Sequence, residues 1–463
     1  MQIDIRRSLM KSFLLIAFAI FTLALLSLSI SSCGAASSND GTASQTDAAQ
    51  AAQTAQADLN VFTNKDFNFQ LIRTAGAAPH AADRNECLQT AYKIIDGNVE
   101  SWYKEWYALA ESVKGAGETA EKLGNKETAR NAFARASNYY RNAGFFLSEK
   151  PLDSRTSDTW TRSVGLFRRA AAMYEPAVEY VEIPYDNTVI PAYFYRGSTT
   201  TAKLPTVIIH QGFDGSKEES IPGGIAAQQH GYNCLIFEGP GQGQMLHDMG
   251  IYFRPDWEVV VTPIVDYLQQ RSDVEPSKIA LIGFSMGGYL APRAASGEHR
   301  LAAVVANGGV YNVFEGVSAH WTSIPEMPQT SAGLLEYIRT KPDEFNQIAY
   351  GAMEYSIGTK WSLAHGMYIF GVSTPAEYFL KLSEMTLDQK VQNITTPVLV
   401  VDSENDHTFP GQPKKLYESL TGKKDFLMFT AEEGADLHCQ AGAAEISWKK
   451  TYEWLDKTLK DKK

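Results

Sequence analysis

After residue 177 the chain carries a series of short, uninterrupted Val/Ile/Leu runs, and segments with helical apolar spacing alternate with them. Such runs are typical of strands that are buried on both faces. Alternating strands and helices predict the α/β class, with a mostly parallel sheet covered by helices on both faces. The predicted strands are residues 180–184, 189–195, 206–210, 233–237, 278–283, 302–306, 398–402 and 426–429, of which the first two form a hairpin.

Residues 59–176, which precede this pattern, are predicted to form a helical accessory domain. Between residues 84 and 175 three long stretches have helical apolar spacing and are separated by Gly-rich or Pro-containing breaks. Segments 135–140 and 169–174 share an Arg-Ala-x-x-x-Tyr pattern, but two copies are too few for a repeat solenoid. The stretches hold more aromatic residues than three isolated helices could bury. We therefore expect them to cover the second domain as a lid, together with an insertion at about 310–385.

Ser285 lies where a predicted strand passes through a tight turn into a helix. Strand 278–283 leads into Gly283-Phe284-Ser285-Met286-Gly287, and a helix-like segment follows at 289–295. This is the G-x-S-x-G pattern in the strand, turn and helix context that it requires. Glycines leave room for so tight a turn. Ser285 is therefore the candidate nucleophile, placed at a helix N-terminus where free N–H groups favour a developing anion.

A serine hydroxyl is a weak nucleophile, so a base and an orienting acid must accompany it. In this architecture they follow in the order Ser, Asp, His. Asp406 comes just after the predicted strand 398–402 and is the candidate acid, with Asp402 at the strand end as the alternative. His438 comes after the last predicted strand and is the candidate base. His407 is adjacent to the acid and cannot easily turn back onto it, so we interpret it as a neighbour.

Stabilising a tetrahedral oxyanion requires two backbone N–H donors. Met286, directly after the nucleophile, is the first candidate, and Phe213 in the loop after the third strand is the second. Residues 238–243 form a Gly-rich segment that resembles a phosphate-binding loop but lacks its lysine, so we interpret it as a structural turn. The nine histidines include no H-E-x-x-H pattern, and the sequence predicts neither a metal nor a cofactor.

The N-terminus has the pattern of an export signal. Basic residues precede an uncharged apolar run at 13–30, which ends in Ile30-Ser31-Ser32-Cys33. This ending resembles the bacterial lipobox, in which the thiol of the cysteine is lipidated. We therefore predict a lipoprotein signal peptide over 1–32 and a lipid anchor at Cys33, with a plain signal anchor as the alternative.

Residues 33–58 are predicted to be a disordered tether, because 34–57 contain no large apolar or aromatic residue. The expected location is the bacterial cell envelope, and Gly34 after the cysteine favours the outer membrane if the host has one.

The formal net charge of the chain is −11 and no long basic cluster precedes its last few residues, so nucleic acid is not expected as a partner. We expect the protein to attach to the membrane only through the lipid anchor.

Taken together, these motifs resemble the α/β-hydrolases of the subgroup that includes 2,6-dihydroxypseudooxynicotine hydrolase and the fungal polyketide-shortening pigment hydrolases, with distant similarity to prolyl-oligopeptidase-type enzymes. The resemblance implies Ser285, Asp406 and His438 as a triad beneath a helical domain. Some members cleave carbon–carbon bonds of 1,3-dicarbonyl-like substrates with the help of an acidic residue in the oxyanion loop, and Asp214 is the matching position. The resemblance spans roughly 85–460 and rests on 129–146, 212–219, 238–243, 256–258, the elbow, Asp406 and 438–440.

The sequence therefore predicts a serine hydrolase that acts through an acyl-enzyme on a small or medium carbonyl substrate, an ester or a carbon–carbon bond of a diketone-like compound. The alternatives are a non-catalytic lipid-anchored surface binding protein and a peptidase of prolyl-oligopeptidase type. The sequence allows one disulfide among Cys87, Cys234 and Cys439, and it leaves the oligomeric state open, a homodimer included.

Overall fold

The computed structural model describes residues 59–147, 153–200 and 202–460. The predicted signal peptide, Cys33 and the tether lie outside these residues. Within them, no helix combines the length and the apolar character needed to cross a bilayer.

The sequence after residue 177 forms the predicted sheet, with strand order β1-β2-β4-β3-β5-β6-β7-β8. β2 pairs antiparallel with β1 on one side and with β4 on the other, and all other neighbours pair parallel. Every predicted strand overlaps an observed one, so the predicted fold class is confirmed. The strands are β1 (Glu179–Tyr185), β2 (Thr188–Tyr195), β3 (Leu204–His210), β4 (Asn233–Phe237), β5 (Val274–Phe284), β6 (Ala303–Asn307), β7 (Val398–Ser403) and β8 (Lys424–Phe429).

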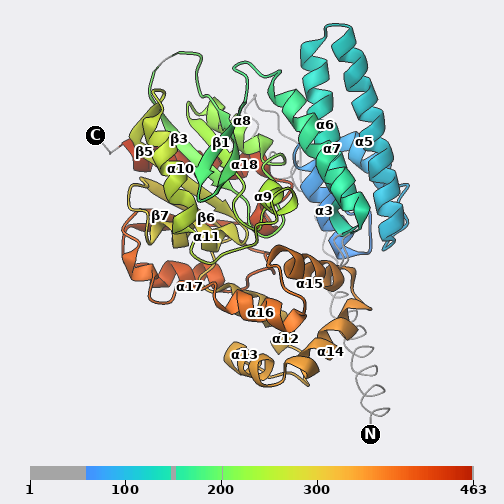
Figure 1. Cartoon of the computed structure of the whole chain (residues 1–463), viewed down its shortest axis with the longest axis vertical. Helices are drawn as coiled ribbons and strands as arrows, with labels where there is room; N and C mark the ends of the chain where they lie inside the picture. Colours follow the sequence, from blue (N-terminus) through green and yellow to red (C-terminus); the bar gives the residue numbers. More distant parts are fainter. Residues whose placement is uncertain (1–58, 148–152, 201, 461–463) are drawn as a thin grey trace, which may run out of the picture. The chain divides into compact units, whose positions relative to one another are not determined.

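Helices cover both faces of the sheet, as the continuous apolar runs require (Figure 1). Along β3, Ile208 belongs to one apolar core and its neighbours Val207 and Ile209 to the other, because successive side chains of a strand point to opposite faces. The first core includes α10 (Glu258–Gln270), α11 (Gly287–Ala295) and α17 (Gln412–Ser419), and the second includes α8 (Ile221–Gln229) and α18 (Ala444–Lys460).

The segment before residue 177 is helical, as predicted, and its core is continuous with one face of the sheet. Phe167 packs on Tyr193 of β2 with ring centroids 4.5 Å apart. The aromatic side chains of the helical segment therefore pack against the sheet as well as against one another. One helix, α3, precedes the three predicted stretches and is capped by Asn64, whose side chain accepts from the Phe67 amide. The helices are α3 (Lys65–Ala75), α4 (Arg84–Ala91), α5 (Val99–Lys122), α6 (Lys126–Gly144) and α7 (Ser154–Ala171).

An all-helical insertion separates β6 from β7, close to the expected limits of 310 and 385. Its own aromatic core includes Trp321, Phe345 and Phe379. Because it follows the carboxyl end of a parallel strand, it begins at the sheet edge where such folds place their sites. The helices, coloured orange to brown in Figure 1, are α12 (Val313–Thr322), α13 (Ser331–Thr340), α14 (Pro342–Met353), α15 (Ile357–Ile369) and α16 (Pro375–Ser383).

Candidate active site

Ser285 occupies the sharp turn between β5 and α11. Its backbone has φ of 60°, a left-handed conformation that is uncommon for a residue with a side chain. The Ser285 amide donates to the Asn307 carbonyl at 2.9 Å, which ties the turn to β6. At Gly283 a Cβ would lie 2.1 Å from the Gly287 carbonyl oxygen, so the turn tolerates no side chain there. The predicted strand, turn and helix context of Ser285 is therefore confirmed.

The structure brings the three predicted side chains into one hydrogen-bonded chain. His438 Nε2 lies 2.8 Å from Ser285 Oγ, and His438 Nδ1 lies 2.5 Å from Asp406 Oδ2. The alternative acid, Asp402, accepts a hydrogen bond from the Ser403 amide instead. This arrangement allows the imidazole to take the hydroxyl proton of Ser285 while the Asp406 carboxylate holds the ring in place.

The electrostatics of His438 and Asp406 are coupled. Burial acts to lower the pKa of His438, but the neighbouring Cys439 sulfur and the Asp406 carboxylate outweigh it, so the pKa lies well above the usual histidine range. Burial likewise acts to raise the pKa of Asp406, but His438 and hydrogen bonds from His438 and Thr408 lower it. Asp406 is therefore an anion at neutral pH.

Because His438 accepts a proton only when neutral, its raised pKa places the rise of kcat/KM with pH above pH 6.5, the usual midpoint of histidine. Asp406→Asn removes the stabilising charge, so the midpoint of the residual activity should move to lower pH. Asp402→Asn removes a carboxylate that interacts with His438 without a hydrogen bond, so it should lower the midpoint by less than Asp406→Asn does. Initial rates across a pH series give the result, and equal midpoints for wild type and Asp406→Asn would contradict this coupling.

The two predicted oxyanion donors converge beside Ser285. Neither the Met286 nor the Phe213 amide has a hydrogen-bond acceptor within the part of the chain that the structure describes. The two loops approach so closely that a Cβ at Gly212 would lie 2.6 Å from the Met286 nitrogen. Gln242 Nε2 donates to the carbonyls of Gln211 and Gly212 at 2.7 and 3.0 Å. The Gly-rich turn after β4 therefore positions the oxyanion loop, which gives it the structural role predicted for it.

His365 on α15 also holds the oxyanion loop, although no motif in the sequence points to it. Its Nε2 donates to the Phe213 carbonyl at 3.1 Å, and its ring stacks on Trp361 with centroids 5.5 Å apart. Burial lowers the pKa of His365, so a neutral ring with the proton on Nε2 fits this contact. The insertion thus holds the oxyanion loop at the peptide that follows Phe213.

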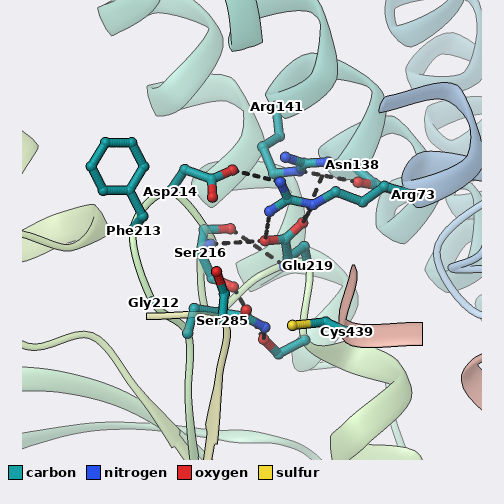
Figure 2. Close-up of polar contacts among 12 residues, drawn as sticks. Arg73, Asn138, Arg141, Gly212, Phe213, Asp214, Ser216, Glu219, Ser285 and Cys439 are labelled. Atoms are coloured by element: carbon teal, nitrogen blue, oxygen red, sulfur yellow. Dashed lines mark hydrogen bonds and ion pairs between the residues drawn. The ribbon is translucent and has the colours of Figure 1, made fainter. Parts of the chain in front are cut away.

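Asp214, the position that the resemblance singled out, is held by an arginine from the helical segment. Arg73 Nη1 donates to Asp214 Oδ2 at 2.5 Å, and its Nη2 and Nε donate to Glu219 at 2.6 and 3.2 Å. Figure 2 shows both carboxylates turned toward Arg73. Burial acts to raise the pKa of Asp214, but Arg73 outweighs it and keeps the carboxyl ionised. Asp214 is thus suited to accept hydrogen bonds and not to donate a proton.

Helix α3 contacts both loops that carry the candidate site. Arg73 reaches the oxyanion loop, and the C-terminal end of α3 meets the segment after His438. A Cβ at Gly76 would lie 2.9 Å from the Cα of Gly442, and one at Gly442 would lie 2.8 Å from Ile72 Cγ2. The helical segment therefore lies against the oxyanion loop and the histidine loop at once.

Cysteines form no disulfide among the described residues. Cys87 and Cys234 are buried free thiols, and Cys439 is free and partly exposed. Cys439 Sγ lies 3.5 Å from His438 Nε2, the atom that also contacts Ser285.

No group of three or more His, Cys, Asp or Glu side chains within the described ranges is arranged to hold a metal ion.

An eight-stranded, mostly parallel sheet, with a serine at a strand-to-helix elbow and a histidine and an aspartate in contact with it, defines an α/β-hydrolase architecture. A family profile described as alpha/beta hydrolase fold matches residues 205–371. Hydrolase LUC6 of Fusarium sp is 30% identical over 416 residues, which cover 86% of this chain and 98% of that protein. The 20-hydroxy-prefusarin hydrolase FUS2 of Gibberella moniliformis is 30% identical over 419 residues, with coverages of 86% and 98%.

The crystal structure of 2,6-dihydroxy-pseudo-oxynicotine hydrolase has the same fold. It superposes with a TM-score of 0.65 over 83% of this chain and 95% of that chain, at 20% sequence identity. The protein therefore belongs to the α/β-hydrolase family and is a hydrolase, related to fungal enzymes such as LUC6 and FUS2.

Proposed function

We propose that the protein is a serine hydrolase that forms an acyl-enzyme on Ser285. Ser285 Oγ attacks the substrate carbonyl carbon as its proton passes to His438 Nε2, and Asp406 stabilises the imidazolium. The amides of Phe213 and Met286 receive the developing oxyanion. The intermediate collapses as the leaving group takes the proton from His438, and a water activated by the same histidine then releases the acid. The observation that carries this proposal is the hydrogen-bonded chain from Asp406 through His438 to Ser285.

A fluorophosphonate probe tests the nucleophile without knowledge of the substrate. We expect the probe to modify Ser285 in the wild type, to label Ser285→Ala not at all, and to label His438→Ala far more slowly, because the base is lost. Ser277→Ala, at an exposed position of β5, is the control and should label like the wild type. Peptide mass spectrometry identifies the site, and labelling that survives in Ser285→Ala would reject the assignment.

The proposed substrate is a small or medium carbonyl compound that is cleaved at an ester or at a carbon–carbon bond of a diketone-like unit. Support comes from the relation to fungal hydrolases, one of which is named for its action on 20-hydroxy-prefusarin. The helical segment would act as a lid, a role supported by the contacts of α3 with the oxyanion loop and with Gly442. An apolar cover excludes water and strengthens the contacts to the oxyanion.

For the location, we propose lipid attachment at Cys33 in a bacterial cell envelope, at the outer membrane where the host has one. The support is the lipobox-like ending of the apolar run. Expressed in a bacterial host, the wild type should fractionate with membranes and incorporate radiolabelled palmitate. Cys33→Ala should lose both properties, whereas Ser31→Ala keeps a small residue before the cysteine and should retain them. A mature Cys33→Ala chain that stays on the membrane would refute the anchor.

A further inference from the structure

Arg141 on α6 is a buried cation whose hydrogen-bonding capacity is mostly unused. Its side chain is 9% exposed, and its Nε donates to Asn138 Oδ1 at 3.3 Å. Nη2 lies 3.4 Å from Glu219 Oε2, an ion pair without hydrogen-bond geometry. Within the described residues neither Nη1 nor Nη2 has an acceptor. Arg73, in contrast, uses all three of its nitrogens on Asp214 and Glu219.

Other buried polar atoms of α3 and α6 are also unpaired. Both amide atoms of Asn142, Oε1 of Gln70 and Oγ1 of Thr74 are buried and have no hydrogen-bond partner among the described residues. These residues belong to the two facing helices α3 and α6, which meet where Asn138 Nδ2 donates to the Thr74 carbonyl at 3.5 Å. Buried donors and acceptors are nearly always paired in folded proteins. Unpaired donors and acceptors on two facing helices, a guanidinium among them, are typical of a site that a polar ligand completes.

This cluster borders the candidate active site. Arg141 faces Glu219, in the loop that carries the oxyanion donor Phe213, and Figure 2 draws it beside Arg73 and Asp214. On α3, Arg73 lies between Gln70 and Thr74 in sequence. The same helix also contacts Gly442, four residues after His438. A group bound by Arg141 would therefore lie beside Glu219, in the loop that also carries the candidate oxyanion donor Phe213.

We propose that Arg141 forms a subsite for a carboxylate carried by the substrate of Ser285. The proposal rests on the proposed function of Ser285. A guanidinium presents two parallel N–H donors that match the two oxygens of a carboxylate, and the free Nη1 and Nη2 supply such a pair. Arg73 makes the hydrogen bonds to Asp214 and Glu219, so the Nη donors of Arg141 are left for a ligand.

Mono-p-nitrophenyl esters of adipate, suberate and sebacate, each compared with its methyl ester, test this subsite. The members of each pair differ in the charge of the distal group, and the three chain lengths cover different spacings from Ser285, while chains of this length avoid the rapid cyclic-anhydride formation of shorter half-esters. We expect the wild type to prefer at least one anionic ester about tenfold or more in kcat/KM over its neutral partner. Arg141→Gln should lower kcat/KM for that ester by about 10- to 100-fold, mainly through KM, and for the methyl ester by less than about threefold.

Two further variants separate recognition from folding. Arg141→Lys keeps the charge and should recover part of the preference. Arg135→Gln makes the same change on the same helix, where the side chain pairs with Glu86 at 3.0 Å, and should leave the preference intact. Equal losses on both members of each pair, or no preference in the wild type, would overturn the subsite. Failure of the proposed function would look different, since Ser285→Ala would then hydrolyse the esters as the wild type does.

Discussion

Ser285→Ala is expected to lower kcat by about 10⁴- to 10⁶-fold, because the residues of a triad act as a unit. His438→Ala should cost nearly as much, since a serine without its base is a weak nucleophile. The double variant should be no slower than either single one. Steady-state kinetics on a p-nitrophenyl ester measure all three, with the background hydrolysis by water subtracted.

The lack of additivity is the informative part of this experiment. If the losses of Ser285→Ala and His438→Ala multiply in the double variant, the two side chains do not work together, whatever the distance of 2.8 Å between them suggests. Circular dichroism and thermal unfolding of each variant confirm that only the chemistry has changed.

Gly212→Ala is expected to lower kcat by about 10²- to 10³-fold, the cost of losing one oxyanion donor. The added Cβ would lie 2.6 Å from the Met286 nitrogen and 2.7 Å from the Phe284 carbonyl oxygen, which are backbone atoms that cannot turn aside. The loop must therefore move and carry the Phe213 amide away from the oxyanion. The rates of ester turnover and of fluorophosphonate labelling should fall together.

Gly115→Ala is the matched control for this substitution. Gly115 lies on α5, where a Cβ would meet nothing within 4 Å, so the change should leave kcat unaltered and stabilise the helix by about 0.5–1 kcal/mol. Full activity of Gly212→Ala would mean that Phe213 is not an oxyanion donor.

The sequence predicted those parts of the fold and the site that local patterns encode. The elbow at Ser285 is local, because a strand, two glycines and a helix specify it within about a dozen residues. Asp406 and His438 lie far apart in the chain, but both follow strands of a parallel sheet, and the carboxyl ends of such strands meet at one edge. Those three side chains could therefore be grouped from the sequence alone.

The supports of the oxyanion loop could not be predicted in this way. Arg73 reaches Asp214 across 141 residues and His365 reaches Phe213 across 152, with no strand order or motif to relate them. Arg73 and Arg141 lie on amphipathic helices, where an arginine usually marks the solvated face. The arginine that pairs with Asp214 comes from a different part of the chain, so only tertiary packing reveals it.

The attachment of α3 to both active-site loops couples the two parts of the chain thermodynamically. Any ligand that binds more tightly when the oxyanion loop is in place also favours the docked position of α3, and by reciprocity the docked helix raises the affinity for that ligand by the same factor. A hydrolase domain cut free at residue 176 would lose Arg73 and with it this mutual stabilisation. If the helical segment of a relative replaces this one, we expect it to dock only when the loop residues that pair with Arg73, Asp214 and Glu219, are replaced with it.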